Sequence, residues 1–311
     1  SEMCIRDRSQ LFFMKLLFIG ASGFLGNNIY PLLERKYEVT TVGLTPQDNY
    51  SVNIAKEIPE LHERYNVVLH AAGKAHSIPK SEAEKQEFFD VNLQGTKNLC
   101  TALEKKGVPQ AFIFISTVAV YGCDFGECIT EEQSLRGVTP YAVSKRLAEE
   151  YLQEWCLEHD VVLSIIRPSL IAGTNPPGNL GAMINGIRRG RYFSIAGGKA
   201  RKSVLMVQDI ANLVPLLIEK GGIYNVCDSY QPTFRELETL ICEQMNKSLP
   251  LSIPYWLAKC MALIGDCFGK KVPINSLKLN KLTRTLTFSN EKAIRELGWK
   301  PMSVLEHFKI R

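Results

Sequence analysis

A short apolar strand near the N-terminus runs directly into a glycine-patterned loop and then into an amphipathic helix. The strand is Lys15 to Ile19, the loop is Gly20-Ala-Ser-Gly23-Phe-Leu-Gly26, and the helix is expected from Phe24 to about Lys36. Glycines permit a tight turn and close backbone approach, and a helix N-terminus favours a pyrophosphate. Strand, spacing and helix agree, so the sequence predicts a dinucleotide site rather than an ordinary glycine-rich turn.

Strands and helices alternate along the rest of the first half. We expect strands at 37–43, 66–70, 111–116 and 161–167, and helices at 88–105 and 141–159. This alternation indicates a Rossmann-type α/β fold, a doubly wound parallel sheet with its ligand site at the carboxyl ends of the strands. Three motifs follow predicted strands directly, as that rule requires: Ala71-Ala72-Gly73, Ser116-Thr117 and Arg167-Pro168.

The length of 311 residues leaves room for a large domain and a smaller one. We expect the dinucleotide-binding domain at 14–170, with returning segments at about 203–228. Residues 171–311 are expected to form mainly a smaller, C-terminal substrate-binding α/β domain. Residues 1–13 have no role in this fold and are interpreted as a non-native leader, with Met14 the likelier start.

Composition excludes several classes of protein. The formal charge is +5, and the chain has no run of like charge and no basic stretch interleaved with aromatics. This pattern argues against nucleic-acid binding and suits a small anionic substrate. The nine cysteines lack metal-ligand spacing, so we expect reduced thiols, a cytoplasmic protein and no metal site. The most apolar region, 254–268, is too short to span a membrane and carries Lys259 and Asp266. It is interpreted as a core helix, with a membrane-surface or partner-binding face as the alternative.

Tyr141 and Lys145 stand four residues apart, on one face of a predicted helix. A free phenol titrates near a pKa of about 10, and a fixed cation beside it favours the phenolate. Tyr141 is therefore a candidate to exchange a proton with a sugar or alcohol hydroxyl. Taken alone, the pair also fits a half-buried aromatic beside a solvated charge.

With these motifs placed, the chain resembles the extended branch of the short-chain dehydrogenase/reductase superfamily. The resemblance is to the NAD-dependent nucleotide-sugar epimerase/dehydratase family typified by UDP-glucose 4-epimerase, and it covers nearly everything from Lys15 to Pro301. The matching motifs are the glycine loop, His70-Ala-Ala-Gly73, Val91-Asn92 with Gly95-Thr96, Phe114-Ile-Ser-Thr117, Val120-Tyr121-Gly122, Tyr141-x-x-x-Lys145, Arg167-Pro168 and Leu297-Gly-Trp-Lys-Pro301.

The resemblance implies roles for residues at matching positions. Thr117 would hydrogen-bond the reacting sugar oxygen, with Ser116 as the alternative one residue away. Tyr141 would be the acid/base, and Lys145 would bind the nicotinamide ribose and hold the pKa of Tyr141 down. The implied cofactor-binding residues are Gly20, Ser22, Gly23, Phe24, Leu25, Gly26, Asn53, Ile54, Ala71, Ala72, Gly73, Tyr141, Lys145 and Pro168.

The match is weaker on the adenine side of the expected cofactor. Many NAD-binding members have an Asp after the second strand that accepts from the ribose 2′-hydroxyl, whereas this chain has Val42-Gly43-Leu44-Thr45. No arginine replaces the Asp there to bind a 2′-phosphate. NAD is therefore favoured and NADP stays open. Asn53-Ile54 stands where the family commonly has Asp-Ile.

Residues of the second half resemble the family's nucleotide-diphosphate pocket. Arg201 or Lys202 would pair with the pyrophosphate, although a solvated basic turn is an equally good interpretation. Asn179 would contact the nucleotide, and Arg284 is a weaker basic candidate. Lys74 and His76 follow the Ala-Ala-Gly turn on the sugar side, and His76 is given no catalytic role.

The two residues after Thr117 help to decide which reaction the resemblance implies. Family dehydratases usually place Asp-Glu just after the Ser/Thr, whereas Val118-Ala119 follows Thr117, which disfavours dehydration. The resemblance then implies 4-epimerisation of a UDP-hexose or UDP-N-acetylhexosamine through a 4-keto intermediate, or alternatively NAD(P)H-dependent reduction of a 4-keto nucleotide sugar. A non-catalytic dinucleotide-binding regulator is a third possibility, disfavoured because Tyr141 and Lys145 are both present. The family also implies a homodimer through the helices at 88–105 and 141–159.

Overall fold

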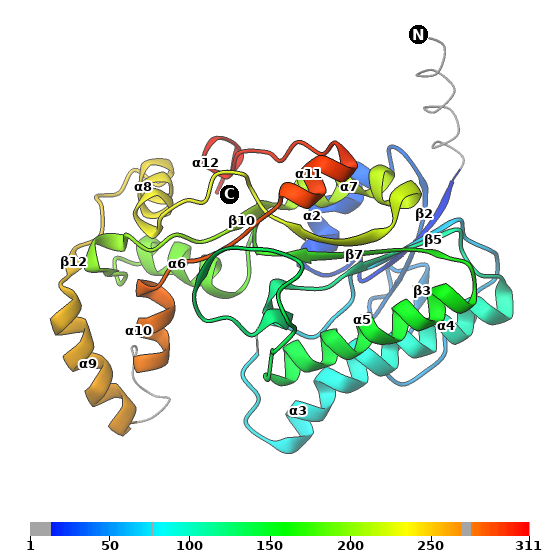
Figure 1. Cartoon of the computed structure of the whole chain (residues 1–311), viewed down its shortest axis with the longest axis horizontal. Helices are drawn as coiled ribbons and strands as arrows, with labels where there is room; N and C mark the ends of the chain where they lie inside the picture. Colours follow the sequence, from blue (N-terminus) through cyan, green and yellow to red (C-terminus); the bar gives the residue numbers. More distant parts are fainter. Residues whose placement is uncertain (1–13, 76, 269–274, 311) are drawn as a thin grey trace, which may run out of the picture.

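The computed structural model describes residues 14–75, 77–268 and 275–310 (Figure 1). The predicted leader, 1–13, and His76 lie outside the described residues. The strands are β1 (Lys15–Ile19), β2 (Glu38–Gly43), β3 (Tyr50–Ser51), β4 (Val67–His70), β5 (Ala111–Ile115), β6 (Gly126–Ile129), β7 (Val162–Pro168), β8 (Leu170–Ala172), β9 (Ser194–Ile195), β10 (Val204–Met206), β11 (Gly222–Val226), β12 (Ser252–Ile253) and β13 (Leu286–Phe288).

Helices connect and cover these strands. The α-helices are α2 (Phe24–Leu33), α3 (Glu82–Phe89), α4 (Gly95–Lys106), α5 (Pro140–Glu158), α6 (Gly178–Arg188), α7 (Val207–Lys220), α8 (Phe234–Gln244), α9 (Tyr255–Phe268), α10 (Ser276–Thr283), α11 (Glu291–Leu297) and α12 (Val304–His307). A π-helical segment, η1 (Asp90–Gln94), joins α3 to α4, and two 3₁₀ turns are η2 (Val118–Tyr121) and η3 (Ala196–Gly198).

Seven strands form one parallel sheet in the order β11-β7-β5-β4-β1-β2-β3. Alternate residues of β1 enter two separate cores, because successive side chains of a strand point to opposite faces. Leu16 and Phe18 pack with α2 and α7 on one face, and Leu17 and Ile19 pack with α4 and α5 on the other. The predicted doubly wound α/β fold is confirmed, with helices on both faces of the sheet (Figure 1).

Two predicted helices differ from the structure at their ends or in their continuity. The helix after the glycine loop ends at Leu33 rather than near Lys36. The helix predicted at 88–105 is the end of α3, then η1, then α4, and the wider π turn carries the fully buried side chain of Asn92. Such π segments are frequent at functional sites.

The C-terminal part carries three small two-stranded sheets: β10 with β8, β12 with β9, and β13 with β6. A separate apolar core lies between α6, α8 and α12. Within the predicted returning segment, β11 joins the edge of the large sheet beside β7, whereas β10 pairs with β8.

The interpretation of 254–268 as a core helix is wrong. Among residues 255–266 of α9, only the small residues Ala258, Ala262 and Gly265 are buried, whereas Trp256 is 67% exposed and Ile264 is 58% exposed. Apolar composition alone does not place a helix in the core, since the small residues of α9 face the protein. Within 14–75, 77–268 and 275–310, no helix is long and apolar enough to cross a membrane.

Candidate active site

The glycine loop lies where the strand order reverses, between β1 and its neighbours β4 and β2. Gly20 has φ +89°, and a Cβ there would lie 2.7 Å from the backbone nitrogen of Ala72. A Cβ on Gly26 would lie 2.1 Å from the carbonyl oxygen of Ala21. Both positions therefore require glycine: Gly20 lets the ends of β1 and β4 come close at the point where open α/β sheets bind ligands, and Gly26 lets α2 pack on the loop.

The N-terminus of α2 faces outward from this loop. Ser22 and Gly23 are exposed, Phe24 and Leu25 are half-buried, and the first turn of α2 has no acidic residue. The free N–H groups of a helix N-terminus attract anions. This geometry fits a dinucleotide pyrophosphate against the predicted residues.

Tyr141 and Thr117 meet at the start of α5. Thr139 caps this helix by accepting from the Ala142 N–H at 3.2 Å, and Pro140 occupies its first position. The half-buried Tyr141 ring lies 6.3 Å from the ring of Phe88, between centroids. Burial raises the pKa of Tyr141, and a hydrogen bond with the Thr117 side chain opposes that rise. The structure thus joins two of the three predicted catalytic residues.

Lys145 lies one turn further along α5 and is buried. Its ammonium donates to the Ile115 carbonyl oxygen at 2.8 Å and stands 4.4 Å from the centre of the Phe114 ring. Burial lowers the pKa of Lys145 to about 8, with Glu149 opposing the change. The expectation that Lys145 lowers the pKa of Tyr141 is wrong for this structure, because the ammonium points to the end of β5 and desolvation dominates at the phenol.

Ser116 and Thr117, adjacent in sequence, point to different surroundings. The Ser116 hydroxyl donates to the Glu149 carboxylate inside the protein. The Thr117 hydroxyl accepts from the Ala119 N–H at 3.1 Å and hydrogen-bonds Tyr141. Successive residues of an extended backbone face opposite sides. The structure therefore favours Thr117 over Ser116 as the residue beside a substrate.

Asn92 holds the loop that follows β4. Its side-chain oxygen accepts from the Lys74 N–H at 2.8 Å, and its amide donates to the Ser144 hydroxyl at 2.9 Å. The Lys74 ammonium pairs with Glu87 beside the Phe88 ring. Lys74 therefore lies near Tyr141, through the Phe88 ring that both side chains contact. The sequence motif contained Asn92, but its contacts with both the loop after β4 and the start of α5 were not predicted.

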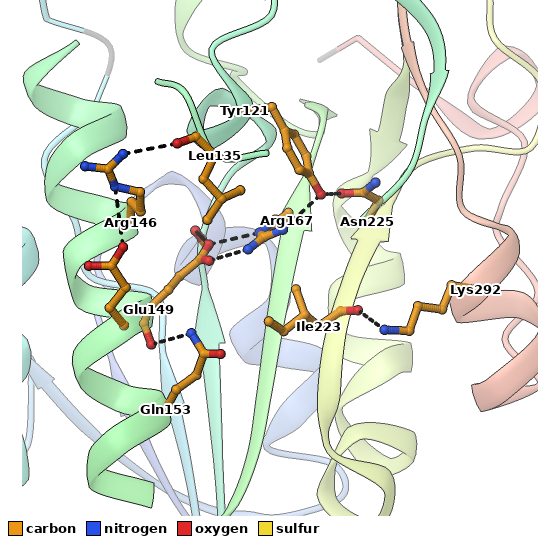
Figure 2. A network of polar contacts seen from close by, with 11 residues as sticks. Tyr121, Leu135, Arg146, Glu149, Gln153, Arg167, Ile223, Asn225 and Lys292 are labelled. Carbon is orange, nitrogen blue, oxygen red and sulfur yellow. Dashed lines mark hydrogen bonds and ion pairs between the residues drawn. The ribbon is translucent and has the colours of Figure 1, made fainter. Parts of the chain in front are cut away.

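A buried ion pair joins Glu149 of α5 to Arg167 of β7 (Figure 2). Arg167 on β7 donates through Nη2 to Glu149 at 2.5 Å and through Nε at 3.1 Å, and these side chains are 4% and 0% exposed. Arg167 also donates to the Tyr121 hydroxyl at 3.0 Å, which donates to Asn225 at 2.7 Å. Glu149 was not predicted from the sequence to be a site residue. The available signal was its spacing, since Tyr141, Lys145 and Glu149 follow at four-residue intervals on one helix face.

The structure supplies a carboxylate on the adenine side that the strand end lacks. Asp48 is buried, and its Oδ2 lies 2.4 Å from where a Cβ on Gly43 would stand. The same carboxylate accepts from the Thr45 N–H at 3.0 Å and from its hydroxyl at 2.7 Å. The family's position directly after the strand has no Asp, but the loop after β2 folds back and puts the Asp48 carboxylate at the end of that strand.

Asn53 and Ile54 have local structural contacts at the predicted position. The Asn53 side-chain oxygen accepts from the Ala55 N–H at 3.1 Å, and the Ile54 carbonyl accepts from Asn98 at 2.7 Å. Pro168, the last predicted cofactor residue, is buried at the end of β7 and pairs with Val226 of β11.

Three of the predicted substrate residues come together from distant segments. The Lys202 ammonium donates to the Arg284 carbonyl at 2.9 Å, and the Arg201 N–H donates to Thr285 at 3.2 Å. Burial, together with Lys281, lowers the pKa of Lys202 to about 8. Asn179 is exposed in the first turn of α6 and has no hydrogen bond to this basic cluster among the described residues. The described residues also contain no group of His, Cys, Asp or Glu suited to a metal ion.

Comparison with known proteins places this arrangement in a family. The model of the NAD dependent epimerase/dehydratase family matches residues 16–227. The chain belongs to this family of enzymes. Among curated relatives, the N-acetyl-alpha-D-glucosaminyl-diphospho-ditrans,octacis-undecaprenol 4-epimerase of Escherichia coli O157:H7 is 27% identical, over 89% of this chain and 88% of the relative. The UDP-glucose 4-epimerase of Vibrio cholerae is 26% identical, over 98% and 95%.

Solved structures show the same fold. The UDP-glucose 4-epimerase of Thermus thermophilus, a complex with NAD, is 22% identical with a TM-score of 0.68, covering 95% of this chain and 99% of that one. The protein RMD of Pseudomonas aeruginosa, a complex with NADPH, is 23% identical with a TM-score of 0.71, covering 95% and 96%. Members of this fold thus bind NAD in one case and NADPH in another.

Proposed function

We propose that this family member is an NAD-dependent 4-epimerase of a nucleotide sugar. The observation that carries the proposal is the hydrogen-bonded pair of Thr117 and Tyr141 beside the buried Lys145. Thr117 would hold the sugar C4 oxygen while Tyr141, as the phenolate, takes the hydroxyl proton, and the 4-keto sugar would result once the C4 hydride has also left for the cofactor. Tyr141 would then return the proton to the same oxygen after the sugar has turned over. Dehydration is not proposed, because Val118 and Ala119 offer no acid or base.

The cofactor-binding residues fit NAD, which supplies the hydride acceptor and donor for this chemistry. The glycine loop would bind the pyrophosphate, and Lys145 would bind the nicotinamide ribose. With a pKa of about 8, Lys145 remains mostly protonated at pH 7 and keeps its positive charge near the reacting groups. On the adenosine side, Asp48 would accept from the ribose 2′-hydroxyl, and its negative charge would repel the 2′-phosphate of NADP.

The basic cluster of Arg201, Lys202 and Arg284 is proposed to bind the substrate diphosphate, and Asn179 the nucleotide. UDP-sugars are the first candidates, since the Vibrio cholerae relative is a UDP-glucose 4-epimerase. The Escherichia coli relative acts on a sugar diphosphate carried by a polyprenol, which presents the same diphosphate to a basic cluster. A 4-keto sugar reductase uses the same Thr117, Tyr141 and Lys145, and is the alternative reaction.

A product analysis tests the proposal. The chain would be incubated with catalytic NAD and a panel of UDP-sugars, with and without N-acetyl groups, and products followed by chromatography with mass detection. A new peak of unchanged mass is expected for an epimerase. Absence of conversion, with NAD(P)H consumed once a 4-keto sugar is supplied, would replace the proposal with the reductase.

Two adjacent substitutions test the assignment of Thr117. Thr117→Val is expected to lower kcat about 100-fold, because it removes a hydroxyl aimed at the reacting oxygen while keeping the side-chain shape. Ser116→Ala is expected to lower kcat less than about 10-fold, since its hydroxyl serves the buried Glu149. Steady-state kinetics of both variants decide whether Thr117 or Ser116 contacts the reacting oxygen. A larger loss in Ser116→Ala would reverse the assignment.

Asp48→Asn tests the cofactor preference. The variant is expected to bind NADH about 10-fold more weakly, because a charged hydrogen bond is worth about 1.5–3 kcal/mol and the amide recovers only part of it. NADPH binding should not weaken, since a repulsive charge is removed. Titration calorimetry with both cofactors measures the ratio, with Asp124→Asn as a control Asp from another loop. An unchanged ratio with lowered thermal stability would limit Asp48 to holding the Thr45 turn.

A further inference from the structure

Helix α9 and its flanks expose an unusual amount of large apolar surface. Nine of the nineteen exposed large hydrophobic side chains of the described residues fall between 249 and 277. On α9 itself Trp256 is 67% exposed, and Leu263 and Ile264 are 55% and 58% exposed. The nine are Leu249, Leu251, Tyr255, Trp256, Leu257, Met261, Leu263, Ile264 and Leu277. An apolar concentration of this kind marks an interaction site.

The opposite side of α9 fixes the helix to the protein. Ala258 and Ala262 are fully buried and form a small core with Ile195 and Leu279, the latter from α10. Figure 1 shows α9 and α10 side by side at one end of the molecule, away from the large sheet. The exposed apolar side is therefore held outward by packing of the small residues.

The same segment contains most of the net positive charge of the chain. The described residues of 247–284 carry five Lys or Arg and one acidic residue, a formal charge of +4, whereas the whole chain carries +5. The single acid, Asp266, accepts from the Ser276 N–H at 3.1 Å and from its hydroxyl. Apolar surface and positive charge thus coincide in one part of the molecule.

We propose that α9, with α10 beside it, docks on the surface of an anionic lipid bilayer. Trp and Tyr favour the boundary between lipid and water, and Lys beside an apolar helix face favours anionic headgroups. The 14 residues of α9 span about 21 Å, enough to lie in the interface rather than to cross the bilayer. A protein partner would have to offer an acidic surface around an apolar groove, whereas an anionic bilayer presents negative charge and apolar chains together.

The docking helices adjoin the basic cluster that binds the substrate diphosphate in the proposed function, so this part of the inference rests on that function. Arg284 follows α10 directly, and its carbonyl accepts from Lys202. The basic cluster proposed for the diphosphate therefore continues from the docking helices. An enzyme held in this way meets sugar diphosphates anchored in the bilayer. Docking itself is measured without substrate, so it can fail or succeed independently of the epimerase activity.

Tryptophan fluorescence of the full chain gives the first measurement. Trp256 is exposed, whereas Trp155 and Trp299 are 4% and 3% exposed, so changes on binding report on α9. Vesicles of equal parts phosphatidylglycerol and phosphatidylcholine should shift the emission to shorter wavelength and protect it from acrylamide. Trp256→Phe should abolish the shift while the protein still floats with the vesicles. An unshifted, fully quenchable emission in the wild type overturns the proposal.

Vesicle flotation with matched variants gives the second measurement. Leu263→Gln with Ile264→Gln should weaken binding at least about 10-fold, because two apolar side chains leave the lipid. Leu157→Gln with Ile58→Gln replaces exposed residues of the same types elsewhere and should leave flotation unchanged. Pure phosphatidylcholine should bind the wild type more weakly. If Leu263→Gln with Ile264→Gln leaves flotation unchanged and only lowers the molecular mass measured by light scattering, then a second copy of the chain covers α9. In that case the proposal fails.

Discussion

Tyr141→Phe is expected to lower kcat by about 10²–10⁴-fold, the range that a positioned proton donor or acceptor contributes. The phenol is the acid/base of the proposed epimerisation, and the change removes one oxygen from a half-buried side chain hydrogen-bonded to Thr117. The ring contact with Phe88 should persist. NADH affinity should therefore change by less than about 3-fold, which is within 1 kcal/mol.

The measurement is single-turnover kinetics on the substrate identified by product analysis, with NADH titration alongside. Tyr151→Phe is a matched control, because Tyr151 lies on the same helix and contacts Lys97 rather than Thr117. Its kcat should stay close to that of the wild type. Retention of full turnover in Tyr141→Phe would exclude Tyr141 as the acid/base, whatever the turnover of Tyr151→Phe.

Glu149→Ala is expected to lower the free energy of unfolding by about 3–5 kcal/mol, because it leaves Arg167 as an uncompensated buried charge. The carboxylate is fully buried and also accepts from Ser116, so its loss leaves several donors without an acceptor. Urea unfolding of the cofactor-free protein measures the change. Activity should fall as well, since Ser116 directly precedes Thr117.

The same helix provides the control for this prediction. Glu150 forms an exposed ion pair with Arg146 at 3.6 Å, and Glu150→Ala should cost only about 0.3–0.5 kcal/mol. Replacing both Glu149 and Arg167 with apolar residues, as Glu149→Leu with Arg167→Met, should recover most of the stability. A loss for Glu149→Ala no larger than that for Glu150→Ala would show that the buried pair does not stabilise the fold.

Local sequence patterns were sufficient to predict the elements that carry the candidate site. The strand from Lys15, the glycine loop and the start of the helix at Phe24 follow from residue order, because a short apolar run and the freedom of glycine act over a few neighbours. The four-residue spacing of Tyr141 and Lys145 likewise placed both on one side of α5. The structure brought Thr117 to Tyr141 as the motif order indicated.

Apart from the end of α2 and the π-helical segment before α4, the errors concern the surroundings of residues rather than the elements themselves. Asp48 lies five residues beyond Gly43, and no pattern within that loop shows that it folds back onto the strand end. The expected effect of Lys145 on the pKa of Tyr141 depended on where the ammonium points, which β5 decides by offering the Ile115 carbonyl. The composition of α9 predicted burial, but within 255–266 the small residues Ala258 and Ala262 face the protein and the large apolar ones are exposed.

The sequence by itself determined the order of strands and helices, the glycine turn and the helix face that carries Tyr141, Lys145 and Glu149. These features depend on backbone geometry and side-chain period, which are properties of neighbouring residues. The tertiary structure alone decided that Glu149 meets Arg167, that Asp48 stands at the end of β2, and that α9 is exposed. Those outcomes depend on desolvation and contact between segments far apart in the chain, and such energies are set only when the whole molecule packs.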